Sequence, residues 1–112
     1  MNNGLNLDSA LSFYEAALVE LEEKVKNPSP DLILQVLTAR QAVQAALTDA
    51  AQPPTKTIMA VIQLDSRLKK QGKAIAQCAN LLEWRTTIHP LPEDWWWFLE
   101  ASEHRLDRLD WL

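Results

Sequence analysis

The side chains that could carry chemistry are few and scattered. Glu100 and His104 are four residues apart and would share one face of a helix, and Glu103 and Asp107 form a neighbouring acidic pair. A zinc or two-metal site needs three or four converging ligands, and this arrangement offers about two. We therefore expect a solvated helix face with a salt bridge to Arg108 and no bound metal.

The chain has one cysteine, Cys78, so an internal disulfide is excluded and a reducing, cytoplasmic setting fits. The position of Cys78 in an apolar helical pattern favours a buried structural thiol over a nucleophile. With only Gly4 and Gly72, the chain has no glycine-rich phosphate loop, and it has no H-E-x-x-H run or nucleophile elbow. The sequence predicts a protein that is not an enzyme and has no cofactor.

The aromatic run at residues 95–98 predicts a contact surface. Successive helical side chains are about 100° apart, so three neighbours sweep roughly 200° of the helix, whereas the core faces a stripe of about 100°. At least one indole should face outward in an isolated chain, and large exposed aromatics mark a partner surface or a membrane boundary. The alternative is that Trp95 or Trp96 closes the end of the fold and Trp97 is merely exposed. The residues expected to bind a partner or a membrane are Trp95, Trp96, Trp97, Phe98 and Trp111.

A basic cluster at residues 67–73 is the second candidate site. It consists of Arg67, Lys69, Lys70 and Lys73, which could contact acidic lipid headgroups or nucleic-acid phosphates. No aromatic residues interleave with it and the net charge is −4, which disfavours nucleic acid. Residues 1–54 carry seven acids and three bases, residues 55–87 two and six, and residues 88–112 six and two. The alternative is therefore that the cluster packs beside acidic neighbours, such as the first helix, or only aids solubility.

The elements that must position these side chains are helices. Glycine is scarce, six prolines fall in short clusters, and Ala, Leu, Gln, Glu and Lys dominate between them. After a lead-in at residues 1–7, Asp8 or Ser9 should cap a first helix, and Ser29 should cap a second that begins at Pro30. Their apolar positions are Leu11, Tyr14, Leu18, Leu21 and Val25, then Ile33, Val36, Val43 and Leu47, with Arg40 interrupting the second set.

A third helix is expected from Thr55, its cap, to about Arg85. Gly72 in its middle indicates a close helix contact or a slight kink, or else is a tolerated surface glycine. A stiff connection at residues 86–92 then precedes a shorter aromatic helix over 92–112. The apolar positions of the third helix are Ile58, Val61, Leu64, Leu68, Gln71, Ile75, Cys78 and Leu82.

These patterns predict one all-α domain over residues 1–112: an up-and-down antiparallel helical bundle with three long helices and a shorter tryptophan-rich helix. The heptad spacing also permits coiled-coil self-association. No run approaches the roughly 20 apolar residues that cross a bilayer. The last helix lacks a polar or glycine stop signal after Asp110-Trp111-Leu112, so we expect the sequence to be the front piece of a longer protein.

The C-terminal segment resembles a known juxtamembrane pattern. Residues 92–99 read P-E-D-W-W-W-F-L and residues 107–112 read D-R-L-D-W-L. These match the P-x-x-W-W-W-x-L and D-x-x-D-W-L runs that precede hydrophobic spans in large uncharacterised cyanobacterial membrane proteins. The resemblance covers roughly the last 21 residues and implies a nearby membrane but no activity.

The function expected from the sequence is a non-catalytic protein-interaction or regulatory domain, the cytosolic N-terminal part of a longer membrane-associated protein. One alternative is a peripheral module that binds anionic membrane, and another is a free-standing, self-associating adaptor. The partner would be a protein or a second copy of the chain. The expected location is the cytoplasm or the cytoplasmic face of a membrane.

Overall fold

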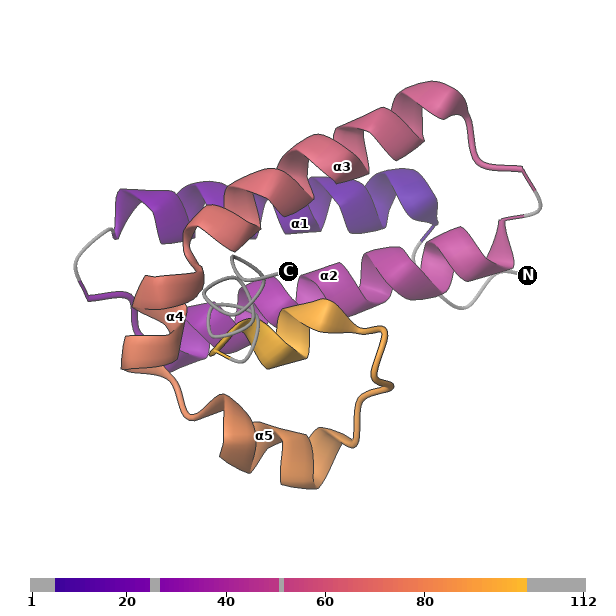
Figure 1. The fold of residues 1–112 in the computed structure, drawn as a ribbon. Helices are drawn as coiled ribbons and strands as arrows, with labels where there is room; N and C mark the ends of the chain where they lie inside the picture. Colours follow the sequence, from indigo (N-terminus) through magenta and orange to yellow (C-terminus); the bar gives the residue numbers. More distant parts are fainter. Residues whose placement is uncertain (1–5, 25–26, 51, 101–112) are drawn as a thin grey trace, which may run out of the picture.

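A computed structural model describes residues 6–24, 27–50 and 52–100, and this part of the chain is all-helical, without strands. The all-α prediction is confirmed. Figure 1 shows the arrangement of the helices. They are α1 (Leu7–Glu23), α2 (Pro30–Asp49), α3 (Thr55–Lys70), α4 (Gly72–Cys78), α5 (Leu81–Ile88) and the 3-10 helix η1 (Trp95–Phe98).

The helix starts follow the capping rules, although two of the three predicted caps are wrong. Ser29 caps α2 as expected, because its hydroxyl accepts a 3.1 Å hydrogen bond from the Leu32 N–H and Pro30 occupies the first helical position. In α1 the cap is Asn6, whose side chain accepts a 2.7 Å hydrogen bond from the Ser9 N–H. Asp8 therefore lies in the first turn, where an acid is favoured by the helix dipole. Thr55 is the first residue of α3 and not its cap, since Pro54 precedes it without a side-chain hydrogen bond.

The third long helix predicted over residues 55–85 is wrong, because the chain breaks twice in this range. The first break is at Gln71, whose N–H bonds to the Leu68 carbonyl at 2.9 Å, and α4 begins at Gly72. The second break follows Cys78, and Asn80 then caps α5 by accepting a 3.0 Å hydrogen bond from the Glu83 N–H. Gly72 is buried, so it is not a surface glycine, and the kink expected there is a complete helix break.

α1 and α2 lie side by side, α3 packs along α1, and α5 lies on the far side of α2 (Figure 1). The short η1 segment lies between α2 and α5 and contacts both. Its start is set by His89, which ends α5 in a left-handed conformation with φ of 52°, and by the prolines that follow. The aromatic run predicted as an α-helix from residue 92 or 93 is thus a 3-10 turn from Trp95.

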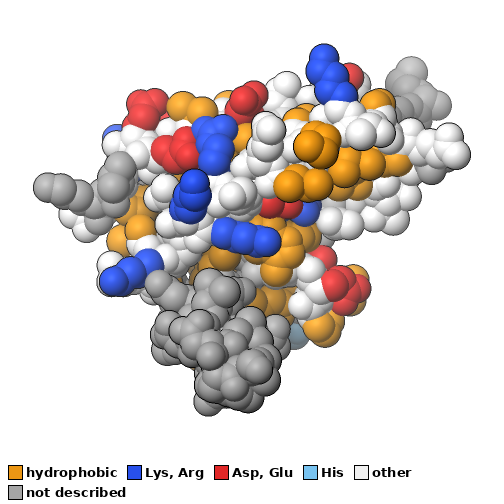
Figure 2. Space-filling view, turned by 45° about the horizontal axis from the view of Figure 1, so that its top comes forward, with side chains coloured by type: hydrophobic (Ala, Val, Ile, Leu, Met, Phe, Trp, Pro, Cys, Tyr) orange, Lys and Arg blue, Asp and Glu red, His pale blue; other side chains and the backbone are white. Residues whose placement is uncertain are grey.

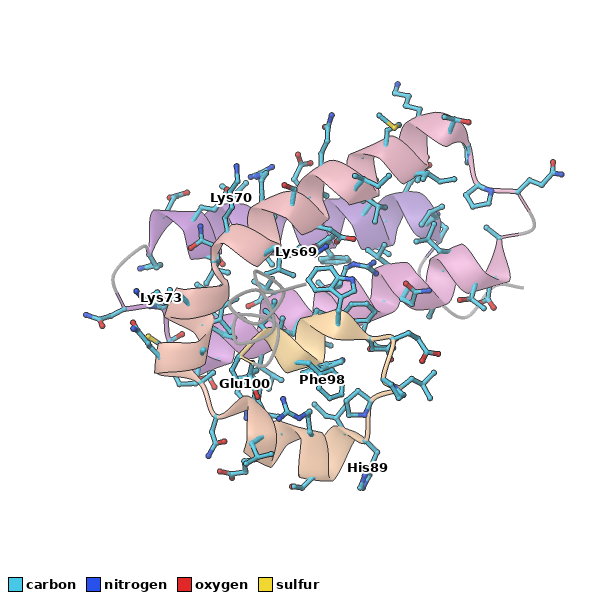
Figure 3. All side chains as sticks on the ribbon, in the orientation of Figure 1. Lys69, Lys70, Lys73, His89, Phe98 and Glu100 are labelled. Atoms are coloured by element: carbon cyan, nitrogen blue, oxygen red, sulfur yellow. The ribbon has the colours of Figure 1, made fainter. Side chains whose placement is uncertain are left out.

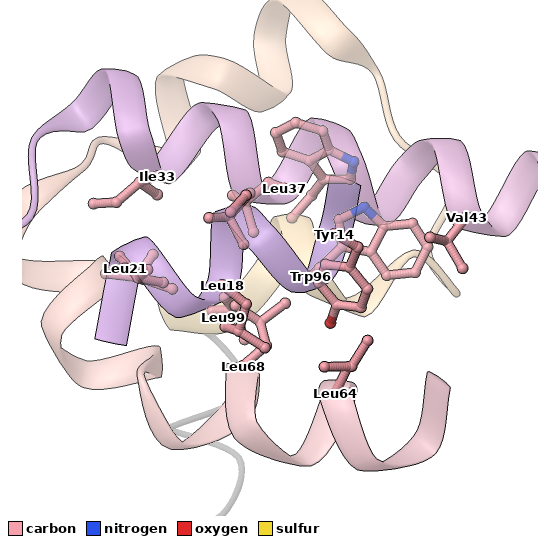
Figure 4. Packing of buried hydrophobic residues seen from close by; sticks show 14 of the residues in the cluster. Tyr14, Leu18, Leu21, Ile33, Leu37, Val43, Leu64, Leu68, Trp96 and Leu99 are labelled. Carbon is pink, nitrogen blue, oxygen red and sulfur yellow. The ribbon is translucent and has the colours of Figure 1, made fainter. Parts of the chain in front are cut away.

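One hydrophobic core includes residues of all these elements. Figure 4 shows the part of it where α1, α2, α3 and Trp96 of η1 meet. Most of the apolar positions predicted for α1 and α2 are buried or partly buried in this core. Ile58 in α3 and Leu82 in α5 are 40% and 65% exposed, so their predicted burial is wrong. Leu82 is exposed because the break before α5 reorients the helix that carries it. The buried apolar residues are Ala10, Tyr14, Ala17, Leu18, Leu21, Ile33, Val36, Leu37, Val43, Val61, Leu64, Leu68, Ile75, Leu81, Trp96, Trp97 and Leu99.

Candidate interaction surface

The tryptophan run is mostly inside the protein. Trp96 and Trp97 are 1% and 2% exposed, while Trp95 and Phe98 are partly buried. At least one indole was expected to face outward, and among the three it is Trp95 that keeps part of its surface exposed, whereas Trp96 and Trp97 are enclosed. The physical reason is that η1 is flanked by α2 and α5 and does not lie on one side of a bundle. Trp111 lies outside the described residues.

Trp96 packs on a buried polar group, which we call the Arg40 cluster: Tyr14, Arg40 and Asp65. The Arg40 Nε and Nη2 atoms donate to the two Asp65 carboxylate oxygens at 2.8 and 3.1 Å. The Tyr14 hydroxyl donates to Asp65 Oδ1 at 2.7 Å. The Arg40 guanidinium carbon lies 4.3 Å from the centre of the Trp96 ring, a distance typical of cation–π contact. The cluster thus links α1, α2, α3 and η1.

Burial sets the electrostatics of this cluster. The Arg40 and Asp65 side chains are 5% and 14% exposed, so each charge depends on the other for compensation. Desolvation raises the pKa of the Tyr14 hydroxyl well above its usual value, and the neighbouring Asp65 charge raises it further. Tyr14 therefore stays neutral and serves as a hydrogen-bond donor.

Trp97 and Arg85 fasten η1 to its neighbours. The Trp97 Nε1–H donates to Gln41 Oε1 of α2 at 2.9 Å, and Arg85 of α5 donates to the Trp97 carbonyl at 2.9 Å. Arg85 also pairs with both carboxylate oxygens of Glu100, one at 3.1 Å, and lies 4.8 Å from the centre of the Phe98 ring. Figure 3 labels Phe98 and Glu100 above α5. Through these contacts Trp97 and Phe98 attach η1 to α2 and α5.

The predicted basic cluster divides into a paired and an exposed part. Arg67 forms a two-pronged pair with Glu22 of α1, with Nε at 2.9 Å from Oε2, and this hydrogen bond lowers the pKa of Glu22. The basic segment thus packs against the acidic first helix at Arg67. Lys69, Lys70 and Lys73 are exposed around the junction of α3 and α4 (Figure 3). The Lys69 Nζ lies 4.7 Å from the centre of the Trp95 ring.

An exposed apolar patch adjoins these lysines. Ile58, Met59 and Ile62 of α3 are 40%, 51% and 56% exposed, and Figure 2 shows hydrophobic side chains gathered over the first half of α3. Residues 4, 7 and 11 apart lie near one line along a helix, because each interval is close to a whole number of 3.6-residue turns. By this spacing Ile58, Ile62 and Lys69 share one line, and Met59 and Lys70 share the next. We call this side of the helix, with Ile58, Met59, Ile62, Lys69 and Lys70, the α3 outer face.

The other potentially reactive side chains among the described residues do not form a common site. Cys78 is a free thiol that is partly buried, and His89 is exposed. Among the described residues no group of three His, Cys, Asp or Glu side chains could hold a metal ion. A hollow of about 430 Å³ on the outside of α1 is lined by Asp8, Ser9, Ser12, Phe13 and Ala16. Glu103, His104 and Asp107, which were expected to form a solvated helix face with Glu100 and no metal site, lie outside the described range.

Sequence reasoning missed two parts of this arrangement. Asp65 and Tyr14 were not singled out as polar partners, although Arg40 on an apolar helix face was a signal that a buried acid must exist. The exposure of Ile58 had no such signal, because it fits the apolar spacing of a core helix; Ile62 lies outside the predicted apolar positions.

Comparison of the chain with protein-family models, with curated proteins and with solved structures found no match. Within the part of the chain that is described, no helix combines the length and the apolar character that crossing a membrane requires.

Proposed function

We propose that this chain is a non-catalytic interaction and regulatory domain that contacts its partner through the α3 outer face. The observation that carries the proposal is the grouping of Ile58, Met59 and Ile62, all at least 40% exposed, on one side of a single helix. Scattered exposed aliphatic residues are normal on a protein surface, but a contiguous patch beside charged residues is typical of a contact site.

The tryptophans have a different role in this proposal from the one expected from the sequence. Trp96 and Trp97 support the frame, because both are buried and each contacts α2 through Arg40 or Gln41. Trp95 alone of the three reaches the α3 outer face, through its contact with Lys69. Removal of Trp96 or Trp97 should therefore unfold the domain before it reveals any loss of binding.

The proposed frame is the up-and-down antiparallel bundle expected from the sequence. Short connections at residues 24–29 and 50–54 join α1 to α2 and α2 to α3, which favours alternating directions for neighbouring helices. α3 packs along α1, and within the described part of the chain Ile58, Met59 and Ile62 on its outer face stay exposed. We also propose a cytosolic setting beside a membrane for this domain.

Photo-crosslinking in the cells that produce the protein tests this function. A photoreactive amino acid is placed at Ile62 of the α3 outer face or at Ser66, an exposed residue about one turn further along α3. Gln35 of α2 and Leu82 of α5 serve as exposed controls. We expect crosslinked adducts, whether protein or lipid, at positions 62 and 66 and not at 35 or 82. Adducts at no position, or equally at all four, would show that the α3 outer face is not the contact site.

A further inference from the structure

We infer that the partner of the α3 outer face is an anionic lipid surface, an inference that rests on the function proposed above. The face combines an apolar half, which can enter the boundary between headgroups and acyl chains, with a basic half, which can meet lipid phosphates. Interfacial helices bind membranes through the same combination of buried apolar area and attraction to anionic lipid.

The apolar half is the first two turns of α3. Ile58, Met59 and Ile62 project there with 40–56% of their surface exposed. Phe13, the other large exposed side chain at this end of the molecule, belongs to the hollow on α1 and not to this helix face. The three aliphatic side chains have no polar atoms that would resist transfer into the acyl boundary.

The basic half is the end of α3 and the start of α4. Lys69, Lys70 and Lys73 are exposed there, whereas Arg67 is already paired with Glu22. Asp65 is the one acid in the sequence of α3, and Arg40 holds both of its oxygens; α4 contains no acid. Glu15 and Glu22 of α1 act on Arg67, and Glu22 also interacts electrostatically with Lys70. Among the described residues, however, Lys69, Lys70 and Lys73 form no salt bridge, so anionic headgroups would meet positive charge that no such pair neutralises.

Trp95 lies beside the basic half of the face, at Lys69. It is partly exposed, and its ring contacts Lys69 at 4.7 Å and the Arg40 guanidinium at 5.8 Å. Indoles prefer the membrane–water boundary because a broad apolar ring carries one polar N–H. Trp95 would both hold the Lys69 stem and contribute to the interfacial contact.

The shape of the molecule favours lipid over an acidic protein. The first half of α3 lies at an edge of the fold, and its second half crosses in front of α1 toward α4 (Figure 1). A flat lipid surface can meet a convex helix directly, whereas a protein would need a groove that matches it. Lipid provides the two required chemistries in fixed order, with phosphates beside acyl chains.

Vesicle flotation with the full chain tests the inference. The probes are phosphatidylcholine vesicles with and without phosphatidylserine, at low and at physiological salt. We expect flotation that requires phosphatidylserine and weakens as salt rises. Lys70→Gln should weaken binding about fivefold, since a lysine near an anionic surface contributes about that factor. Ile62→Ser and Met59→Ser should also weaken it.

Matched controls come from exposed residues elsewhere. Lys24→Gln removes one exposed lysine, and Leu82→Ser removes an aliphatic side chain that is 65% exposed, so neither should change flotation. Circular dichroism of every variant verifies the fold. Absence of flotation at low salt, binding without phosphatidylserine, or equal losses in the controls would overturn the lipid assignment. Crosslinking at position 62 without flotation would overturn only the lipid assignment and keep the interaction function.

Discussion

The Arg40–Asp65 pair should contribute strongly to the stability of the fold. A double-mutant cycle measures how strongly the two side chains are coupled in the free energy of unfolding. Asp65→Leu removes the acceptor of two hydrogen bonds from Arg40 and one from Tyr14. It leaves a guanidinium group that is only 5% exposed without a counter-charge. Loss of one partner of a buried pair typically costs about 3–5 kcal/mol of unfolding free energy. For a domain with roughly 5–15 kcal/mol in total, such a loss is severe.

The second single variant and the double variant complete the cycle. Arg40→Leu leaves Asp65 bound only to Tyr14 and removes the cation on the Trp96 ring. The double variant leaves no buried charge, and apolar replacement of a buried pair is often close to neutral. We therefore expect the double variant to be more stable than the sum of the single losses predicts, with a coupling energy of about 2–3 kcal/mol.

The chain has a natural control for this cycle. The Arg67–Glu22 pair has comparable geometry, but its side chains are 34% and 31% exposed. Solvent screening should reduce its coupling energy to about 0.2–1 kcal/mol. Urea unfolding followed by circular dichroism gives both values, provided that the slopes of the transitions agree among the variants. Equal coupling energies for the two pairs would refute the view that burial of Arg40 makes it central to the fold.

Three further results are expected from the same contacts. Trp96→Ala should cost about 3–5 kcal/mol in thermal or urea unfolding, and the partly exposed Trp95→Ala clearly less; equal costs would contradict the placement of the indoles. Folding stability should fall as pH rises above about 10, because the raised pKa of Tyr14 means that the folded state holds this proton more tightly than the unfolded state. Tyr14→Phe should remove that part of the alkaline loss, and an unchanged pH profile would contradict it. The lowered pKa of Glu22 acts in the opposite direction, so Glu22→Gln should cost under about 1 kcal/mol at neutral pH and nothing once the pH is well below 4.5.

The first half of the fold could be predicted because its signals are local. Ser29 followed by Pro30 sets the start of α2 whatever the rest of the chain does, and the spacing of apolar residues identifies the inner faces of α1 and α2. The third helix could not be predicted by the same means. Its apolar spacing continues through Gln71 and Cys78, where the chain breaks, because a heptad pattern records which residues are buried and not whether the backbone between them is continuous. Asn80 was the one local signal of the second break.

Of the candidate site, the sequence could predict the lysines but not the contacts that depend on how the helices pack. Composition alone identified the lysines after Arg67, and their exposure agrees with a role in binding. The position of Asp65 beside Arg40 depends on how α3 packs against α1 and α2, a tertiary relationship between residues 25 positions apart. The apolar half of the α3 outer face was missed because Ile58 fits the spacing of core residues, while Met59 and Ile62 lie outside that spacing and were not recognised as a surface patch.

The prediction for the tryptophan run assumed a helix with the core on one side, which could not cover three successive indoles. In a 3-10 helix three successive side chains are about 120° apart, so they point around the whole axis. Such a segment can be buried only if other elements surround it. Here Trp96 meets the guanidinium of Arg40, Trp97 donates to Gln41, and Trp95 reaches Lys69. Three neighbouring indoles thus join η1 to α2 and to α3, while Arg85 fastens the same segment to α5. The run therefore serves first as the junction that holds α5 and α3 to the α1–α2 pair. Trp95 also contacts Lys69 of the α3 outer face, so one residue of the run belongs to both the frame and the proposed binding surface.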